Sequence, residues 1–189
     1  MEMVFANRAA DVLDARVFRL GEKFEYAEFL VLCFLSFMMP FLLGHPQLLV
    51  GIVVNAFLVL AALNMDSKKA MGLALIPSMG AIARGALFGP FTVSLVYMVP
   101  FIWAGNMVLI FAMKCLVAGK KMNYFAALGA GSLAKAGLLF GAAYVLLQFS
   151  LVPALFLEAM GTIQLVTAVA GGILAFVLWK AMARLGIVA

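Results

Sequence analysis

The sequence predicts an all-α, polytopic membrane protein, a bundle of six transmembrane helices with short loops. Of its 189 residues, 67% are apolar or aromatic and 11% are charged, whereas soluble domains hold about 45–50% and about 25% of these classes. The mean hydropathy is +1.18, and long stretches carry no charge. These values exclude an ordinary soluble domain and leave no polar block long enough to form one outside the membrane.

Six apolar segments are long enough to cross a bilayer. A helix needs about 20 apolar residues for about 30 Å of hydrocarbon, and somewhat fewer where its ends reach the headgroups. The predicted spans are residues 27–44, 46–63, 70–88, 92–117, 123–148 and 160–186. Gly44, His45 and Pro46 predict a tight turn between the first two spans, and Gly89-Pro90 predicts another between the third and fourth. Residues 27–189 are therefore expected to form one six-helix transmembrane domain.

The segment 1–26, before the first span, is predicted to lie on the cytoplasmic side. It lacks the basic start, short apolar stretch and small-residue cleavage site of a signal peptide. Val12, Leu13, Val17 and Leu20 would line one side of a short helix on the inner membrane surface. A tail without fixed structure is the equally weighted alternative.

The basic residues predict the orientation of the spans. Cytoplasmic loops retain Lys and Arg, and eleven of the 13 basic residues lie before the first span, at the second and fourth connections or at the C-terminal end. They are Arg8, Arg16, Arg19, Lys23, Lys68, Lys69, Lys114, Lys120, Lys121, Lys180 and Arg184. Both termini are therefore predicted to be cytoplasmic in a prokaryotic cell membrane. The net charge of +5 then reflects topology rather than a nucleic-acid partner.

Polar side chains within the spans converge on the outer half of the predicted bundle. Such groups are costly in hydrocarbon, so they face the bundle interior or a watery cavity. At about 1.5 Å per residue, Lys135 lies near the midplane and Arg84 in the outer half. We expect a cavity open to the outside. Its candidate substrate-binding residues are Arg84, Trp103, Asn106, Lys135, Gln164, His45 and Glu158.

Each of these residues also has an interpretation without a ligand. Arg84 could reach the outer headgroups or pair with Glu158, and Lys135 could serve packing alone, neutral or bonded to backbone carbonyls. Asn106, like Asn55, could join helices by hydrogen bonds. Gln164 and His45 lie close enough to water for simple exposure to explain them, and Trp103 could belong to the core or to the membrane interface.

Small residues follow one face of the fifth span. They are Ala126, Ala130, Ala134, Gly137 and Gly141. Intervals of four between small residues let helix backbones approach closely. This face is predicted to pack against another helix, by default one of this chain and alternatively one of a partner subunit.

Residue types that support catalysis are scarce. No GxSxG, HExxH or phosphate-binding loop occurs, and after Glu25 the only acidic residues are Glu28, Asp66 and Glu158. One histidine and two cysteines argue against a metal site, a heme or a disulfide framework. We expect no enzyme, no cofactor and no bound metal. The spans also lack the interior carboxylate that a proton-coupled carrier uses.

The residues alone leave three hypotheses about the function open. A transport subunit that binds a small molecule fits the expected cavity. A membrane enzyme acting on a lipid-borne substrate would have to use Lys135, His45 and Glu158. A structural or assembly subunit would place its partner on the small-residue face of the fifth span.

Two segments resemble a known family. "LIPSMGAIARGALFGPF" (75–91) and "MGTIQLVTAVAGGILA" (160–175), in a chain of six short-looped spans, are similar to the substrate-binding membrane subunit, or S component, of energy-coupling factor (ECF) transporters. The resemblance implies high-affinity capture of a vitamin-sized small molecule from outside. It also implies, besides membrane lipids, a transmembrane coupling subunit and two cytoplasmic ATPases that drive release inward while the S component topples in the membrane.

The chain departs from the family pattern at two places. Its first span lacks the AxxxA pattern used for docking, so docking would use another surface such as the series that starts at Ala126. It begins Met1-Glu2 instead of Met-His, which argues against nickel or cobalt as the cargo. Arg84 and Lys135 would suit a ligand that bears a carboxylate or phosphate, with the tryptophan as an apolar or stacking wall.

Overall fold

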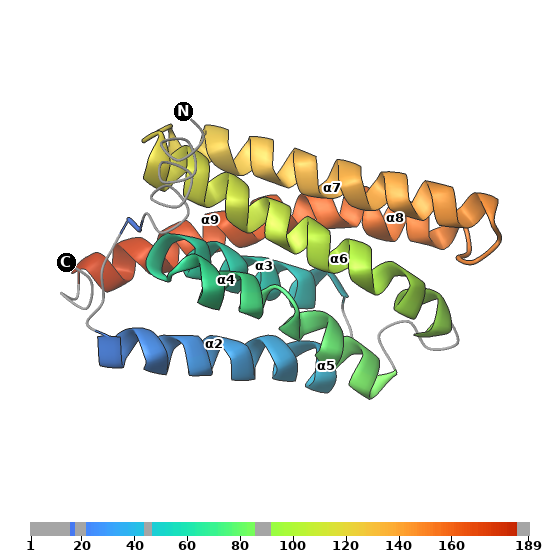
Figure 1. Cartoon of the computed structure of the whole chain (residues 1–189), viewed down its shortest axis with the longest axis horizontal. Coiled ribbons are helices and arrows are strands. Elements are labelled where there is room, and N and C mark those ends of the chain that lie inside the picture. The colour runs from blue at the N-terminus through green and yellow to red at the C-terminus, as the bar shows by residue number, and fades with distance from the viewer. Residues whose placement is uncertain (1–15, 18–21, 44–46, 86–91, 185–189) are drawn as a thin grey trace, which may run out of the picture.

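The computed structural model describes residues 16–17, 22–43, 47–85 and 92–184, and every regular element in these ranges is a helix. The helices are α2 (Glu22–Leu42), α3 (Gln47–Asn64), α4 (Ser67–Leu73), α5 (Ile76–Arg84), α6 (Thr92–Met113), the π-helix η2 (Lys114–Gly119), α7 (Tyr124–Gln148), α8 (Leu155–Met160) and α9 (Thr162–Arg184). They run roughly along one axis (Figure 1). The fold is therefore the all-helical bundle that the sequence predicts.

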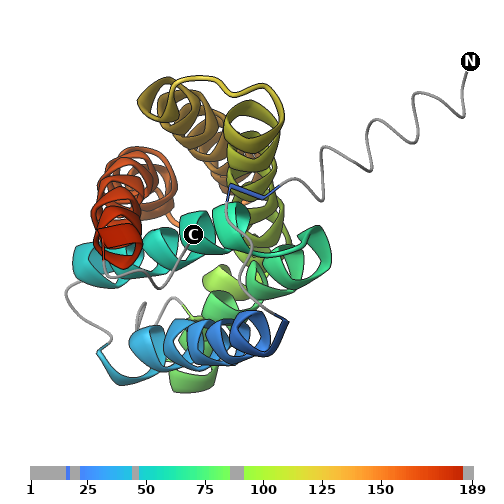
Figure 2. The same ribbon diagram turned by 90° about the vertical axis from the view of Figure 1, so that its left-hand side faces the viewer.

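The bundle is organised around α3. Seen along its axis, α3 and α4 lie between a layer of α2 and α5 and a group formed by α6, α7 and α9 (Figure 2). The most extensive contacts join α3 to α9, α6 to α7 and α2 to α5. Glycines permit the close pairs: a Cβ on Gly171 of α9 would collide with the α3 backbone at Ile52, and one on Gly80 of α5 would collide with the α2 backbone at Phe37.

Five helical segments of the described chain are long and apolar enough to cross a membrane. They are Phe24–Leu42, Gln47–Asn64, Thr92–Gly119, Tyr124–Gln148 and Leu155–Arg184. They coincide with five of the predicted spans, with boundaries that differ by a few residues. The chain is accordingly a helical membrane protein by length and composition of its helices.

The third predicted span, 70–88, is not one continuous helix. Its described residues belong to α4 and α5, which have 7 and 9 residues and are separately too short to span. Pro77 explains the break, because it has no N–H to offer the carbonyl of Leu73 four residues earlier. A break at membrane depth is tolerated where protein surrounds it, and Ala74, at the break, is fully buried. Residues 86–88 lie outside the described residues.

The small-residue face of α7 points away from the bundle. Its members Ala126, Ala130, Ala134, Gly137 and Gly141 are all exposed. A Cβ placed on Gly137 or Gly141 would meet no described atom within 4 Å. The default expectation of a contact inside the chain is therefore wrong: the interval of four shows that backbones can approach, but it does not show which side of the helix the core occupies.

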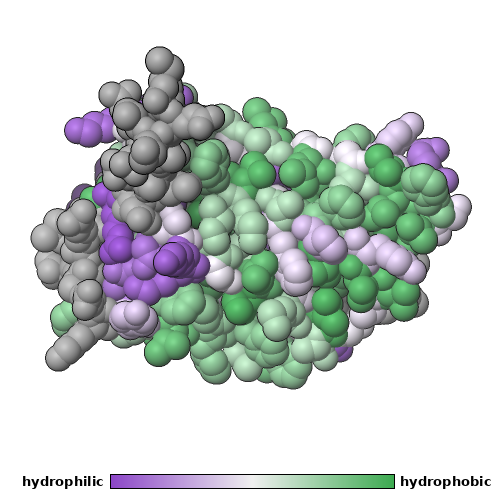
Figure 3. Space-filling model, viewed as in Figure 1, coloured by the Kyte–Doolittle hydropathy of each residue, from purple (hydrophilic) through white to green (hydrophobic). Residues whose placement is uncertain are grey.

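Charged side chains gather at one end of the bundle, where α2 begins and α9 ends (Figure 3). At its centre the carboxylate of Glu25, 2% exposed, accepts hydrogen bonds from Arg16 Nη1 at 2.5 Å and Lys69 Nζ at 3.0 Å. Asp66 caps the N-terminus of α4 by accepting from the Lys69 backbone N–H at 2.8 Å. The Val17 N–H donates to the Leu63 carbonyl at 2.9 Å, so residues 16–17 are bound to this end.

The segment 1–26 is expected from the sequence either to form a short helix on the membrane surface or to lack fixed structure. Its described part consists of residues 16–17, which contact the bundle, and the beginning of α2, which starts at Glu22, five residues before the predicted span. Val12, Leu13 and Leu20 lie outside the described residues, as do Arg8 and Arg19. The described basic residues other than Arg84 and Lys135 belong to helix ends and turns at the charged end, which agrees with the segregation that the sequence shows.

The ionisation of Asp66 links this cluster to pH. Burial by itself raises the pKa of the Asp66 carboxyl, but hydrogen bonds from Lys69 and the charges of Lys69 and Arg16 outweigh it, so this pKa lies below its ordinary value. Because the folded pKa is the lower one, the carboxylate stabilises the fold above the unfolded pKa of about 3.9. That stabilisation is lost as the pH falls through the folded value.

We therefore expect acid to destabilise the wild-type protein more than an Asp66→Asn variant. Asparagine keeps a side-chain oxygen for the cap of α4 but removes the titrating group. The measurement is the Tm of both proteins in detergent from about pH 6 to about pH 3, the range in which a depressed carboxyl pKa acts. Parallel decline of the two curves would contradict the role given to Asp66.

Candidate functional site

A cavity of about 100 Å³ is lined by residues of α3, α5, α6, α7, α8 and α9 and by Pro40 of α2. Because about 10–15 Å³ of such space holds one water, the cavity has room for several waters or for a small organic group. It occupies the half of the bundle remote from the charged end, since its lining residues come from the end of α2 and the beginnings of α3, α6 and α9.

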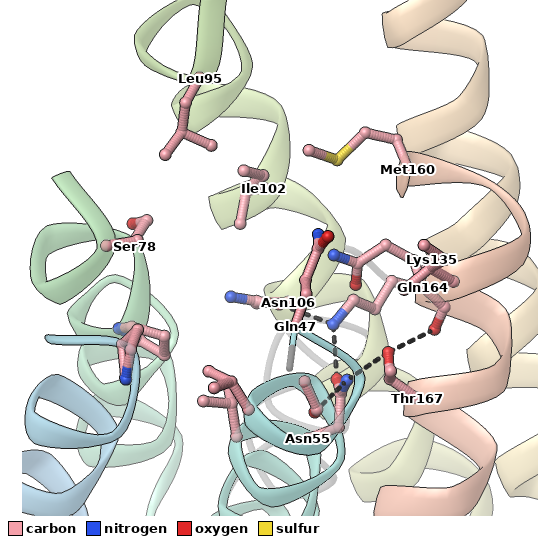
Figure 4. A pocket seen from close by; sticks show the side chains of 17 residues that line it. Gln47, Asn55, Ser78, Leu95, Ile102, Asn106, Lys135, Met160, Gln164 and Thr167 are labelled. Carbon is pink, nitrogen blue, oxygen red and sulfur yellow. Dashed lines mark hydrogen bonds between the residues drawn. The ribbon is translucent and has the colours of Figure 1, made fainter. Parts of the chain in front are cut away.

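Lys135 forms the polar centre of this cavity. Its residue is 2% exposed, and Nζ donates to Asn55 Oδ1 at 2.6 Å and to Asn106 Oδ1 at 2.8 Å. Figure 4 shows the three side chains converging from three helices, Lys135 from α7, Asn55 from α3 and Asn106 from α6. A buried amine and two amides thus join the central helices at one point.

The other ends of the two amides are also held. Asn55 Nδ2 donates to the Gly51 carbonyl at 2.9 Å and to Thr167 Oγ1 at 3.3 Å. Asn106 Nδ2 donates to the Ala74 carbonyl, at the break between α4 and α5, at 2.9 Å. Because each amide nitrogen is committed to an acceptor, each amide oxygen turns toward Lys135.

Among the described residues, the site holds the buried amine of Lys135 but no carboxylate that could pair with it. No described residue that lines the cavity is Asp or Glu. A protonated lysine has three N–H groups, and two of them are accounted for by Asn55 and Asn106. Burial of a charge is costly unless an opposite charge or several hydrogen bonds compensate it. The arrangement is suited to holding an acceptor next to Lys135.

The cavity wall away from Lys135 is apolar. Leu95, Ile102 and Met160 line it from α6 and α8 (Figure 4). The half-buried amides of Gln47 and Gln164 also line the cavity, from the first turns of α3 and α9. The site therefore has a polar side at Lys135, an apolar side, and two amides close to the helix ends.

Of the seven predicted site residues, the structure brings three to the cavity: Asn106, Lys135 and Gln164. Trp103 is not a lining residue, but its indole Nε1 donates to Ser78 Oγ at 2.6 Å. Ser78 itself lines the cavity and donates to the Leu75 carbonyl at 2.9 Å. Trp103 is thus placed to position Ser78 rather than to form the wall.

Arg84 and Glu158 do not line the cavity, and His45 lies outside the described residues. Arg84 Nη1 donates to the carbonyls of Phe41, at 2.6 Å, and Leu42, so it caps the C-terminus of α2. Glu158 is exposed on α8 and forms no ion pair with Arg84. Arg84 therefore has a structural role that neither a ligand nor Glu158 is needed to explain.

Four polar lining residues were missed as site candidates from the sequence: Gln47, Asn55, Ser78 and Thr167. A single hydroxyl in an apolar helix is common and gives little signal. Asn55 gives a clearer signal, since an amide within a predicted span is costly unless it is bonded, but the sequence alone indicates only a helix-joining role for it.

We expect Asn106→Leu to destabilise the protein by about 2 kcal/mol, because it leaves the Ala74 carbonyl and one Lys135 N–H buried without a partner. Ser132→Ala is the matched control. Its Oγ is buried with no partner in the described structure, so its loss should change stability little. Thermal unfolding of both variants in the same detergent provides the comparison. Equal Tm values for the two variants would show that the hydrogen bonds of the Asn106 amide do not stabilise the fold.

No protein-family model matches this chain, and comparison with curated proteins and with solved structures finds no significant match. The resemblance to the ECF S components therefore rests on the sequence features alone.

Proposed function

We propose that the chain is the substrate-capture subunit of an ECF-type importer, which binds a small, vitamin-like molecule from the outer side for uptake driven by partner subunits. The observation that carries the proposal is the buried Lys135, Asn55 and Asn106 cluster at the inner end of a cavity inside a membrane bundle. Charged side chains at such depth are costly and are characteristic of substrate pathways.

The orientation supports capture from outside. The charged end of the bundle, with Arg16, Lys69 and their carboxylate partners, fits the cytoplasmic side by the bias of Lys and Arg. The cavity lies in the opposite half. In a prokaryotic cell membrane with both termini cytoplasmic, this half faces outward.

The outward face of α7 is the surface that we assign to the coupling subunit. It consists of the five small residues from Ala126 to Gly141, all exposed and uncovered by any described helix. Helices associate in membranes through van der Waals contact and close backbone approach rather than hydrophobic burial. A flat strip of Ala and Gly offers that contact to a partner helix, and the partner's two ATPases would supply the energy.

The same strip also favours a second candidate, a structural or assembly subunit of another membrane complex. That function needs the partner surface but not the cavity. The two functions are therefore separated by experiments that alter the cavity and the α7 face one at a time.

For the cavity, we expect native mass spectrometry of gently purified protein to show one bound small organic molecule. Ala81→Phe should abolish its retention, because Ala81 is 8% exposed and lines the cavity, so a phenyl group there fills the space. Ala130→Phe, on the outward face of α7, is the matched control and should retain the molecule. If neither protein ever carries a ligand, capture is not the function.

For the α7 face, we expect Gly137→Phe to disrupt association with the coupling subunit while ligand retention persists. The phenyl group projects into open space, so it leaves the fold intact but prevents close helix approach. Copurification of coupling subunit and ATPases from the native host membrane is the readout, with Ala81→Phe as the reciprocal control that keeps the partner. Undiminished copurification of Gly137→Phe would move the docking surface elsewhere.

A further inference from the structure

We infer that the molecule captured in this cavity is a monocarboxylate with an apolar body, whose carboxylate group is received by Lys135 and Asn106. This inference rests on the proposed function and specifies the chemical class of its substrate.

The buried polar groups offer donors and few acceptors. The oxygens of Asn55 and Asn106 already accept from Lys135. Thr167 Oγ1 accepts from Asn55 and donates to the Gln164 carbonyl at 3.2 Å. Two N–H groups are left without an acceptor: the third N–H of a protonated Lys135 and the second N–H of the Asn106 amide. A group that binds here must therefore accept hydrogen bonds, as the two oxygens of a carboxylate do.

Charge balance selects a single negative charge. Lys135 is the one basic residue among the described residues that line the cavity, and none of them is acidic. An anion bound beside its amine favours the protonated form. A carboxylate beside it forms a neutral buried pair, whereas a phosphate dianion would leave one negative charge uncompensated in a low-dielectric site. A neutral or cationic ligand would leave the ammonium without a counter-charge.

The apolar side of the cavity accounts for the rest of the ligand. Leu95, Ile102 and Met160 face the polar cluster across the cavity (Figure 4). Apart from the polar cluster around Lys135, the lining is apolar except for Ser78 and the amides of Gln47 and Gln164, and Ser78 is committed to Trp103 and Leu75. A ligand with one carboxylate and a compact hydrocarbon body satisfies both sides.

The test compares ligands that differ only in the head group. Purified protein in detergent, freed of retained ligand, is titrated with butanoate, hexanoate and octanoate, with the corresponding primary amides and with the corresponding primary amines, by calorimetry and thermal shift. We expect at least one carboxylate to bind about tenfold or more tightly than its amide, the effect of a charge-assisted hydrogen bond, and the amines not to bind.

Two variants assign the preference to Lys135. Lys135→Gln should bring the carboxylate and the amide to equal affinity, and Lys68→Gln, an exposed lysine outside the cavity, should leave the wild-type ratio unchanged. Asn106→Asp keeps the lysine and the size of the side chain but supplies an internal carboxylate. It should abolish the preference for carboxylates, so the inference stays testable if Lys135→Gln fails to fold.

Amides or amines that bind as tightly as the carboxylates would overturn the inference, and so would the absence of binding by every carboxylate. An unchanged carboxylate preference in Asn106→Asp would do the same. These failures are separable from failure of the proposed function. A neutral or cationic molecule retained by the wild type and lost in Ala81→Phe would leave capture in place and remove only the carboxylate.

Discussion

The hydrogen bonds that the buried amine of Lys135 requires join the central helices of this bundle. Lys135 is fully surrounded by protein at membrane depth, where an unpaired polar group costs several kcal/mol. Its bonds to Asn55 and Asn106 tie α7 to α3 and α6, and the other ends of these amides reach Thr167 of α9 and the Ala74 carbonyl. Four helices and the break between α4 and α5 are thereby held by one network, and the cavity is the space beside it.

The break between α4 and α5 belongs to the same arrangement. Pro77 interrupts the helix, and the carbonyl of Ala74 is bonded by Asn106 instead of by the following helical turn. The shorter α5 then lies against α2, where Arg84 caps the end of α2 and a glycine permits close contact. The break that accompanies this proline leaves the neighbouring carbonyl of Ala74 to Asn106, which also accepts a hydrogen bond from Lys135.

How far the sequence predicts this structure depends on the kind of interaction. Hydropathy locates the spans because each must be apolar over a fixed length, and depth alone marks Lys135 and Asn106 as costly. The role of Arg84 is not predictable, because its acceptors lie on α2 more than 40 residues earlier, at 41 and 42. The outward direction of the Ala126 to Gly141 strip is equally hidden, since spacing defines a face but not its neighbour.

Helix α7 carries both of the features that the proposed function needs. Successive residues on a helix point about 100° apart, so Lys135 faces the cavity while its neighbour Ala134 lies on the exposed strip. A ligand bound at Lys135 and a subunit docked on the strip therefore act on one rigid element. If either event alters the position of α7, linkage requires the effects to be reciprocal: a ligand that weakens docking must itself be bound more weakly by the docked protein. Where that coupling is unfavourable, docking on the strip promotes the ligand release that the proposed import function requires.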